Sequence, residues 1–230
     1  MDHSEIVQRL AEVIIFESLN EGELKDIAQK GQFLTYKKDD VILFESDSSN
    51  DVYIILEGLV KISRTNKEFK EVILAILAER DFFGEMSALD EGRRSADVTS
   101  ITKVHLLKLS QQFFLDLLEK FPIVSLALLR EMVGRIRKTD HHLKNISLGD
   151  AAAKVASVLI RLADEVGRQR RGRVEIDSIA SQQEMANFAA TSRETISRVF
   201  SIFEKEGFIE REMNKIIITD FDAFKQRFGK

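Results

Sequence analysis

The stretch SQQEMANFAATSRETISRVFSIFEKEGFI, residues 181–209, predicts two short helices in close succession. Ser181 and Glu184 have the spacing of a capping box at the start of the first helix, and Thr191 and Glu194 have the same spacing at the start of the second. Two short helices joined by a turn of three or four residues form a helix-turn-helix. This stretch therefore decides the fold class of the C-terminal part of the chain.

The second of these helices has two different faces. Its apolar face is expected to pack on the preceding helix, and its opposite face is polar and carries Arg193, Glu194, Ser197 and Arg198. The start of the second helix of a helix-turn-helix enters the major groove of DNA, where Arg can pair with guanine and Glu can accept from cytosine. We interpret the polar face as a surface that contacts bases. The alternative is a solvated face on which the capping box alone explains Glu194.

The neighbouring segments complete a small domain. GFIEREMNKIIITD, residues 207–220, predicts a strand–turn–strand wing, and FDAFKQRF, residues 221–228, predicts a closing helix. On the N-terminal side, residues 151–167 predict a helix with Asp150 at its N-cap, and RQRRGRVEI, residues 168–176, predicts a basic turn and a short strand. The C-terminal third is therefore predicted to be a winged helix-turn-helix.

The N-terminal half has a different pattern. Residues 1–30 show short helical patterns, whereas residues 32–109 contain several β-branched, roughly alternating runs separated by acidic, Ser and Gly turns. Short strands at this spacing are typical of a β-barrel or jelly roll. The fold class expected for the whole chain is α+β.

A long helix is predicted from Pro122 to about residue 146, because proline suits the first turn of a helix. Its apolar seam has alternating spacings of three and four residues and consists of Leu129, Met132, Ile136, Thr139, Leu143 and Ile146. The seam can pack on its own domain or form a parallel two-helix dimer contact. We favour the dimer, because Thr139 and the adjacent Asp140 form a polar interruption that a purely structural seam does not need. We place the domains at 1–148 and 149–230, with a hinge near Ser147–Asp150.

Composition excludes several classes of protein. The chain has no cysteine, which removes disulfides, iron–sulfur clusters and cysteine zinc sites and suits a reducing cytoplasm. It has no run of about 18 apolar residues, so no membrane span is expected, and its acidic start does not resemble a secretory signal. The net charge is −4, but residues 151–230 hold 14 Lys and Arg against 12 Asp and Glu, so only this third is basic.

A second polar cluster interrupts the strands at DFFGEMSALDEGRRSADV, residues 81–98. Gly84 permits a tight turn, and EMSALDE can form a short helix whose free amides suit an anion. Arg94 and Ser95 follow at the turn back into a strand, and a guanidinium, a hydroxyl and amides together suit a phosphate. Glu85 needs a sugar hydroxyl or a cation beside it. The alternative is a structural Glu–Arg ion pair at a corner of the barrel.

The segment FGEMSALDEGRRSA closely resembles the phosphate-binding cassette of cyclic-nucleotide-binding domains. With the long helix and SRETISR, the chain resembles the CRP/FNR family of bacterial transcription regulators over essentially its whole length. The resemblance implies an N-terminal cyclic-nucleotide-binding jelly roll, a long dimerisation helix and a C-terminal winged helix-turn-helix. It also implies a cytoplasmic homodimer that binds a palindromic double-stranded operator and contacts RNA polymerase.

The resemblance assigns roles by position. Arg94 and Ser95 become ligands of the cyclic phosphate, Glu85 accepts the ribose 2′-hydroxyl, and Arg135 pairs with Glu85. The amides around Gly84, Met86 and Ser87 help to hold the nucleotide, and Thr139 and Asp140 lie against its base. In the DNA domain, Arg193, Glu194 and Arg198 match contacts to bases. The expected contacts to DNA phosphates, which set position rather than sequence, are Gln183, Ser192, Thr195 and Lys215.

The chain departs from the family pattern at several positions. Asp140 stands where the cyclic-AMP receptor has Ser, and a carboxylate suits guanine's donors at least as well as adenine's amino group. The expected effector is therefore cyclic AMP or cyclic GMP, with cyclic AMP favoured. Asp39, Ser46 and Arg80 replace turn glycines of the barrel, and Asp tolerates left-handed geometry more easily than Ser or Arg.

Two other functions stay open at this point. The first is a regulator of the same fold that responds to a different effector or needs none. The second is a cupin-like metal enzyme fused to a DNA-binding domain, which requires a cage of histidines in the barrel. Only His105 lies there, and no nucleophile–base pair is evident, so we expect neither an enzyme nor a metal site.

Overall fold

The computed structural model describes residues 1–68, 71–148, 150–177, 181–212 and 215–229, with only the backbone described for 141–148. The chain forms two compact units, each described by itself. The first consists of Met1–Arg64 and Ala75–Arg137, and the second of Thr65–Leu74 and Lys138–Lys230. No helix within the described ranges is both long and apolar enough to cross a membrane.

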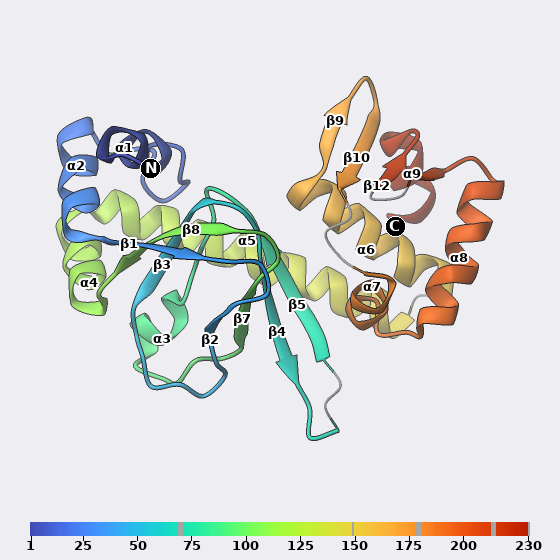
Figure 1. The fold of residues 1–230 in the computed structure, drawn as a ribbon, viewed down its shortest axis with the longest axis horizontal. Coiled ribbons are helices and arrows are strands. Elements are labelled where there is room, and N and C mark those ends of the chain that lie inside the picture. Colours follow the sequence, from blue (N-terminus) through green and yellow to red (C-terminus); the bar gives the residue numbers. More distant parts are fainter. Residues whose placement is uncertain (69–70, 149, 178–180, 213–214, 230) are drawn as a thin grey trace. The chain divides into compact units, whose positions relative to one another are not determined.

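Two four-stranded antiparallel sheets form the jelly roll in the N-terminal half of the chain (Figure 1). The first sheet has the order β1-β8-β3-β6, and the second has the order β2-β7-β4-β5. The bounds of these strands are β1 Gln32–Tyr36, β2 Val41–Leu43, β3 Val52–Glu57, β4 Val60–Thr65, β5 Glu71–Leu77, β6 Phe82–Phe83, β7 Asp97–Ser100 and β8 Val104–Leu109. The predicted β architecture is confirmed.

Strand β3 explains why this unit has two cores. Its residues Val52–Leu56 are all buried, so both faces of the strand are covered. Tyr53 and Ile55 belong to the core formed by strand residues, whereas Val52, Ile54 and Leu56 belong to a core shared with helices. Those helices are α1 His3–Leu10, α2 Glu21–Lys30, α4 Gln111–Lys120 and α5 Pro122–Leu148, and the short α3 spans Glu85–Asp90.

Three turns adopt left-handed backbone without glycine. Asp39, Ser46 and Arg80 have φ values of 68°, 72° and 78°, as expected if they replace turn glycines. Ser46 also donates its amide to the carbonyl of Arg94, and Arg94 donates its amide to the carbonyl of Asp47. The loop after β2 is thereby anchored to the strand that follows the cassette.

Helix α5 corrects the predicted seam. Met132 packs against the core of its own unit, whereas the next residue, Val133, is 49% exposed. The exposed apolar row keeps the spacing of three, four and three residues and consists of Leu126, Leu129, Val133 and Ile136. The predicted seam residue Met132 is partly buried against this core, so the exposed row passes through Val133 at this level of the helix. The side chains of Leu143 and Ile146 lie outside the described residues.

The second unit contains the predicted winged helix-turn-helix. Its helices are α6 Ala151–Val166, α7 Gln182–Phe188, α8 Arg193–Lys205 and α9 Phe221–Phe228. Its sheet has the order β11-β12-β10-β9, with β9 Arg168–Arg170, β10 Arg173–Asp177, β11 Ile209–Glu212 and β12 Lys215–Ile218 (Figure 1). The wing is β11 and β12, and the residues that join them, 213–214, lie outside the described part.

Two of the three predicted N-cap residues are confirmed. Asp150 caps α6 through the amide of Ala153, and Ser181 forms the predicted capping box with Glu184. The predicted capping box of Thr191 and Glu194 is wrong, because Ser192 is the N-cap of α8 and accepts from the amide of Thr195 at 3.2 Å. Thr191 instead donates its amide to the carbonyl of Ala186, which closes the end of α7.

The turn of the helix-turn-helix contains a strained position. Ala190 has a φ of +47°, in the left-handed region where a Cβ atom is unfavourable. The neighbouring Ala189 has a φ of −83° and is 1% exposed. Of these two alanines, only Ala190 has a backbone conformation that favours glycine.

We expect Ala190→Gly to stabilise the second unit by about 1 kcal/mol, because glycine adopts this backbone without a steric penalty. The measurement is urea unfolding, combined with hydrogen exchange of the α7 and α8 amides to locate the effect. Ala189→Gly is the matched control and should destabilise the unit. Equal destabilisation by both substitutions would contradict the strain at Ala190.

Candidate effector site and nucleic-acid interface

The cassette begins where β6 turns sharply at Gly84. Gly84 has a φ of +85° and precedes α3, whose start has no side-chain cap. A Cβ atom there would lie 2.7 Å from Nη1 of Arg94 and 2.8 Å from the carbonyl oxygen of Asp51. Only glycine fits, because both the backbone angle and the lack of space exclude a side chain.

Arg94 lies at the centre of the cassette and is 4% exposed. Its Nη1 donates to the carbonyl of Gly84 at 2.9 Å and to Oγ of Ser87 at 2.8 Å. Its Nη2 donates to the carbonyl of Asp51 at 2.7 Å, and its Nε donates to Oγ of Ser49 at 3.1 Å. A guanidinium has five N–H groups, so these four bonds leave one without an acceptor in the part of the chain described.

Tyr53 covers one face of this guanidinium. Its ring centre lies 5.9 Å from Cζ of Arg94, and its ring stacks on Phe83 at 5.1 Å. Burial, together with the charge of Asp51, raises the pKa of Tyr53 to about 12, so its phenol stays neutral at pH 7. The guanidinium is therefore packed against an aromatic ring on one face and surrounded by hydrogen-bond acceptors.

Glu85 and Arg135 form the second charged element of the site. Glu85 is buried, and its Oε1 lies 3.1 Å from Nη1 of Arg135. Arg135 also donates to the carbonyl of Phe82 at 2.9 Å and pairs with Glu131 at 3.2 Å. Burial raises the pKa of Glu85, and the charge of Arg135 opposes this rise. A carboxylate held this way keeps lone pairs that can accept from a hydroxyl.

The structure brings most of the predicted effector residues together. Gly84, Ser87 and Arg94 are in direct contact, and Glu85 meets Arg135. Ser95 is exposed, and its hydroxyl lies 3.8 Å from Sδ of Met86, which is itself 55% exposed. Thr139 and Asp140 are exposed residues of the second unit, so their predicted contacts to a base stay untested.

Sequence reasoning missed the residues that surround the two arginines. These are Ser49, Asp51 and Tyr53 around Arg94, and Phe82 and Glu131 around Arg135. Ser49 and Asp51 lie more than 40 positions before Arg94, in a polar run typical of any turn. The only local signal was Glu131, which lies one helical turn before Arg135.

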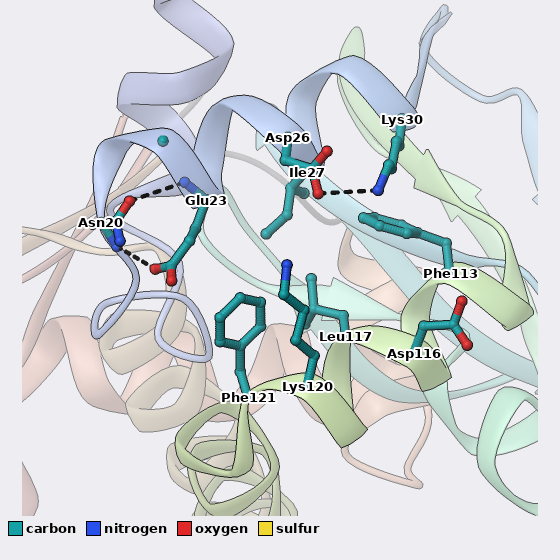
Figure 2. Close-up of a pocket in the computed structure, with 11 residues that line it drawn as sticks. Asn20, Glu23, Asp26, Ile27, Lys30, Phe113, Asp116, Leu117, Lys120 and Phe121 are labelled. Carbon is teal, nitrogen blue, oxygen red and sulfur yellow. Dashed lines mark hydrogen bonds and ion pairs between the residues drawn. The ribbon is translucent and has the colours of Figure 1, made fainter.

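A separate groove lies between α2 and α4 (Figure 2). In this groove Lys30 pairs with Asp26 at 3.1 Å and lies 5.0 Å from the ring centre of Phe113. None of the predicted effector residues lines it. Across the described ranges, no three His, Asp or Glu side chains gather as a group that could hold a metal ion.

The candidate nucleic-acid interface is the start of α8. Ile196, Val199, Phe200 and Phe203 are buried, as the amphipathic pattern predicts. Arg193, Glu194, Ser197 and Arg198 are exposed on the other side, and the two arginines form no ion pair with any residue that the structure describes. This arrangement presents two guanidinium groups and a carboxylate at the helix end that, in DNA-binding helix-turn-helix proteins, enters the major groove.

The carboxylate of Glu194 is exposed and can accept further hydrogen bonds. Hydrogen bonds from its own backbone amide and from the Ser192 hydroxyl lower the pKa of Glu194, so it is ionised at neutral pH. Because Ser192 caps the helix, the carboxylate of Glu194 is not required for the cap. The carboxylate nevertheless stays bonded to the N-cap residue Ser192, so a structural role at the helix start remains open.

The predicted phosphate contacts surround this helix start. Gln183 on α7 is exposed and donates to Asn187 at 3.0 Å. Ser192 and Thr195 share a hydrogen bond between their hydroxyls at 3.1 Å. Lys215, at the start of β12 in the wing, lies 3.4 Å from Glu175. Their roles as DNA contacts stay predictions.

Two family models match this chain. The cyclic nucleotide-binding domain matches residues 33–121, and the Crp-like helix-turn-helix domain matches residues 153–227. These models cover the jelly roll with its cassette and the winged helix-turn-helix. The protein is thus of the class of transcription regulators that join a cyclic-nucleotide-binding domain to a DNA-binding domain.

Comparison with known proteins gives the family. The cyclic AMP receptor protein of Thermus thermophilus is 33% identical over 76% of this chain and 77% of its own length. A CRP-like cAMP-activated global transcriptional regulator of Mycobacterium tuberculosis is 28% identical over 95% of this chain and 97% of its own length. The chain belongs to the CRP/FNR family of transcription regulators. FixK2 from Bradyrhizobium japonicum has the same fold, with a TM-score of 0.75 at 18% identity over 85% of this chain and 96% of its own.

The raised pKa of Glu85 predicts a specific pH dependence. The folded protein takes up a proton at Glu85 at a higher pH than the unfolded chain does. Glu85 therefore destabilises the fold at neutral pH, and this effect disappears as the pH falls through the raised pKa toward the unfolded value of about 4.3. As the pH falls, the free energy of unfolding of the native protein should rise relative to that of Glu85→Gln. The rise should be about 1.4 kcal/mol for each pKa unit by which folding raises the pKa of Glu85.

The measurement is the free energy of unfolding of both proteins between pH 7 and pH 4. The difference between them isolates Glu85, because all other carboxylates are shared. A difference that stays constant across this range, or that changes in the opposite direction, would contradict the raised pKa.

Proposed function

We propose that this protein is a homodimeric transcription regulator whose binding to DNA is controlled by a cyclic nucleotide, either cyclic AMP or cyclic GMP. The observation that carries the proposal is the cassette itself. Around one uncapped turn lie Arg94, the exposed hydroxyl of Ser95, and the buried Glu85 with its half-buried partner Arg135. A cation and a hydroxyl suit a cyclic phosphate, and a buried carboxylate suits a ribose hydroxyl.

The residue roles follow from this chemistry. Arg94 and Ser95 bind the cyclic phosphate, together with amides around Gly84, Met86 and Ser87. Glu85 accepts from the ribose 2′-hydroxyl, and Arg135 keeps its carboxylate in place and ionised. The proposed ligands of the phosphate are N–H and O–H donors, so this binding mode does not require a metal ion.

Thr139 and Asp140 are the proposed contacts to the base. The carboxylate of Asp140 can accept from the amino group of adenine or from the ring N–H and amino group of guanine. The same carboxylate favours a second candidate, a regulator of this fold that responds to another effector or to none. A thermal-shift panel of nucleotides separates the two, because only the leading proposal predicts stabilisation by cyclic AMP or cyclic GMP.

The exposed row on α5 supports a homodimer. Leu129 and Ile136 are 63% and 61% exposed, which is unusual for apolar side chains on a helix. Their spacing with Leu126 and Val133 is that of a two-helix contact, and the other face of the helix is already covered by its own unit. A parallel contact between two copies of α5 would bury this row.

The dimer would present two recognition helices to one palindromic operator. Half-sites for such pairs lie about 34 Å apart, one turn of DNA. We propose Arg193, Glu194, Ser197 and Arg198 as base contacts and Gln183, Ser192, Thr195 and Lys215 as phosphate contacts. RNA polymerase is a further proposed partner, on the strength of the family.

We place the domain boundary at 148/149 and a hinge at Ser147–Asp150. Residue 149 and the side chains of Ser147 and Leu148 lie outside the described residues. Asp150 begins a new helix as its N-cap, so the helical path changes at this point. Effector binding would act on the hinge and thereby set the spacing of the recognition helices.

The test of the proposal is a DNA-binding experiment. Operators are selected from a randomised duplex library in the presence of cyclic AMP, cyclic GMP or no nucleotide, and affinities are then compared at one salt concentration. A selected palindrome whose affinity increases with one nucleotide supports the proposal. Equal affinity under all three conditions would favour the second candidate, and failure to select any sequence would overturn the DNA-binding proposal.

Val133→Asp should prevent dimer formation, because it places an unpaired charge in the middle of the proposed contact. The dimer dissociation constant should rise by roughly 100-fold or more. The measurement is sedimentation over a range of protein concentrations, with circular dichroism to confirm folding. Lys138→Asp is the control, because it changes the charge by a larger amount at a position away from the row. A folded Val133→Asp variant that remains dimeric would show that the dimer uses another surface.

Glu194→Ala should relax discrimination at one base pair of each half-site by about 1–3 kcal/mol. Nonspecific binding should keep its dependence on salt, because no cation is removed. Glu206→Ala removes the same charge at the other end of α8 and should leave discrimination unchanged. The measurement is binding to a panel of single-base operator variants. A uniform loss across the panel would assign Glu194 to helix stability instead.

A further inference from the structure

The bond between Ser49 and Arg94 differs from the other bonds in the cassette. Two acceptors of the guanidinium are backbone carbonyls, those of Gly84 and Asp51, and a third is the hydroxyl of Ser87, which is 3% exposed. Ser49 is the fourth acceptor, and it is an exposed side chain on the loop before β3. It is therefore the acceptor that an incoming ligand can displace most easily.

The number of N–H groups makes such a displacement necessary. A guanidinium holds a phosphate best through two adjacent N–H groups. Arg94 has five N–H groups and uses four of them within the protein, so only one is uncommitted. A two-point grip on an anion requires one existing acceptor to leave.

The two carbonyls cannot leave without moving the backbone. The Gly84 carbonyl belongs to a turn that is already restricted to glycine, and the Asp51 carbonyl directly precedes strand β3. Ser87 also donates its hydroxyl to the Gly84 carbonyl at 3.3 Å, which holds it in place. The hydroxyl of Ser49, in contrast, can leave the guanidinium by rotation of its side chain alone.

We propose that the Ser49 hydroxyl occupies the place of an effector oxygen on Arg94 and competes with the cyclic phosphate for this guanidinium. The proposal rests on the proposed function, because it assigns a regulatory residue to the same site. In the free protein Ser49 satisfies the buried charge, and in the complex the phosphate replaces it. Ser49 thereby positions Arg94 and lowers the affinity for the effector.

The surrounding loop can tolerate this exchange. Ser46 and Asp47 are bound through backbone hydrogen bonds to Arg94, and the Asp51 carbonyl keeps its bond to Nη2. Both ends of the segment that contains Ser49 therefore remain fixed when its hydroxyl leaves. The change is confined to residues 48–50, so the competition involves one hydrogen bond rather than the unfolding of a loop.

The test compares three variants of the whole 230-residue chain by calorimetry with cyclic AMP and cyclic GMP. Ser49→Ala removes the competitor and should increase affinity roughly two- to tenfold, the range of one net hydrogen bond. Ser49→Thr keeps a hydroxyl and should behave like the native protein. Ser48→Ala is the matched control, because Ser48 is an exposed neighbour for which the structure shows no hydrogen bond.

Exchange of the Arg94 Nε proton, followed by NMR, gives a second readout. In the absence of nucleotide this proton should exchange slowly in the native protein and in Ser49→Thr, and faster in Ser49→Ala. Lower or unchanged nucleotide affinity in Ser49→Ala would overturn the competition. If the native protein binds neither nucleotide, the proposed function fails, and unchanged proton exchange in Ser49→Ala would then overturn the Ser49 bond separately.

Discussion

The buried guanidinium of Arg94 is the interaction on which the geometry of the effector site depends. A buried charge is unfavourable unless polar groups surround it, and Arg94 obtains them from the loop at Ser49–Asp51 and from the cassette at Gly84–Ser87. The backbone of Arg94 also pairs with Ser46 and Asp47. One side chain thus fixes two segments that are distant in sequence. The requirement for glycine at position 84 has the same cause, because any Cβ atom would displace this guanidinium.

Helix α5 connects this site to the exposed apolar row. One face of the helix packs on the first unit through Val124, Leu128 and Met132, while the next residues along the helix leave Val133 and Ile136 exposed. Arg135 lies between those two exposed positions and holds the buried carboxylate of Glu85. A ligand that changes the charge balance at Glu85 therefore acts directly on the helix that carries the proposed dimer contact.

The features of the fold that depend on residues close together in the sequence could be predicted from the sequence. The capping box at Ser181, the N-cap at Asp150 and the apolar face of α8 depend on neighbours within a few residues, and all three are confirmed. Thr191 and Ser192 both have a suitable side chain for the start of α8, and the bond from Thr191 to Ala186 decided between them. Met132 and Val133 both suit a seam on a helix, and only the position of the first sheet showed which one is covered. The acceptors of Arg94 come from long-range packing and have no sequence signature.

The second unit has a complete core of its own, which constrains how an effector can regulate it. Phe203 and Phe208 contact Phe224 and Phe228 of the closing helix, and Ile196 and Val199 are buried beneath the polar face of α8. The start of α8 is capped by its own Ser192. Because the recognition helix is folded and capped by residues of its own unit, nucleotide binding is not needed to form it. Regulation under the proposed function must therefore act on where the two recognition helices of a dimer are held, and α5, which carries both Arg135 and the exposed row, is one part of the chain through which that control can pass.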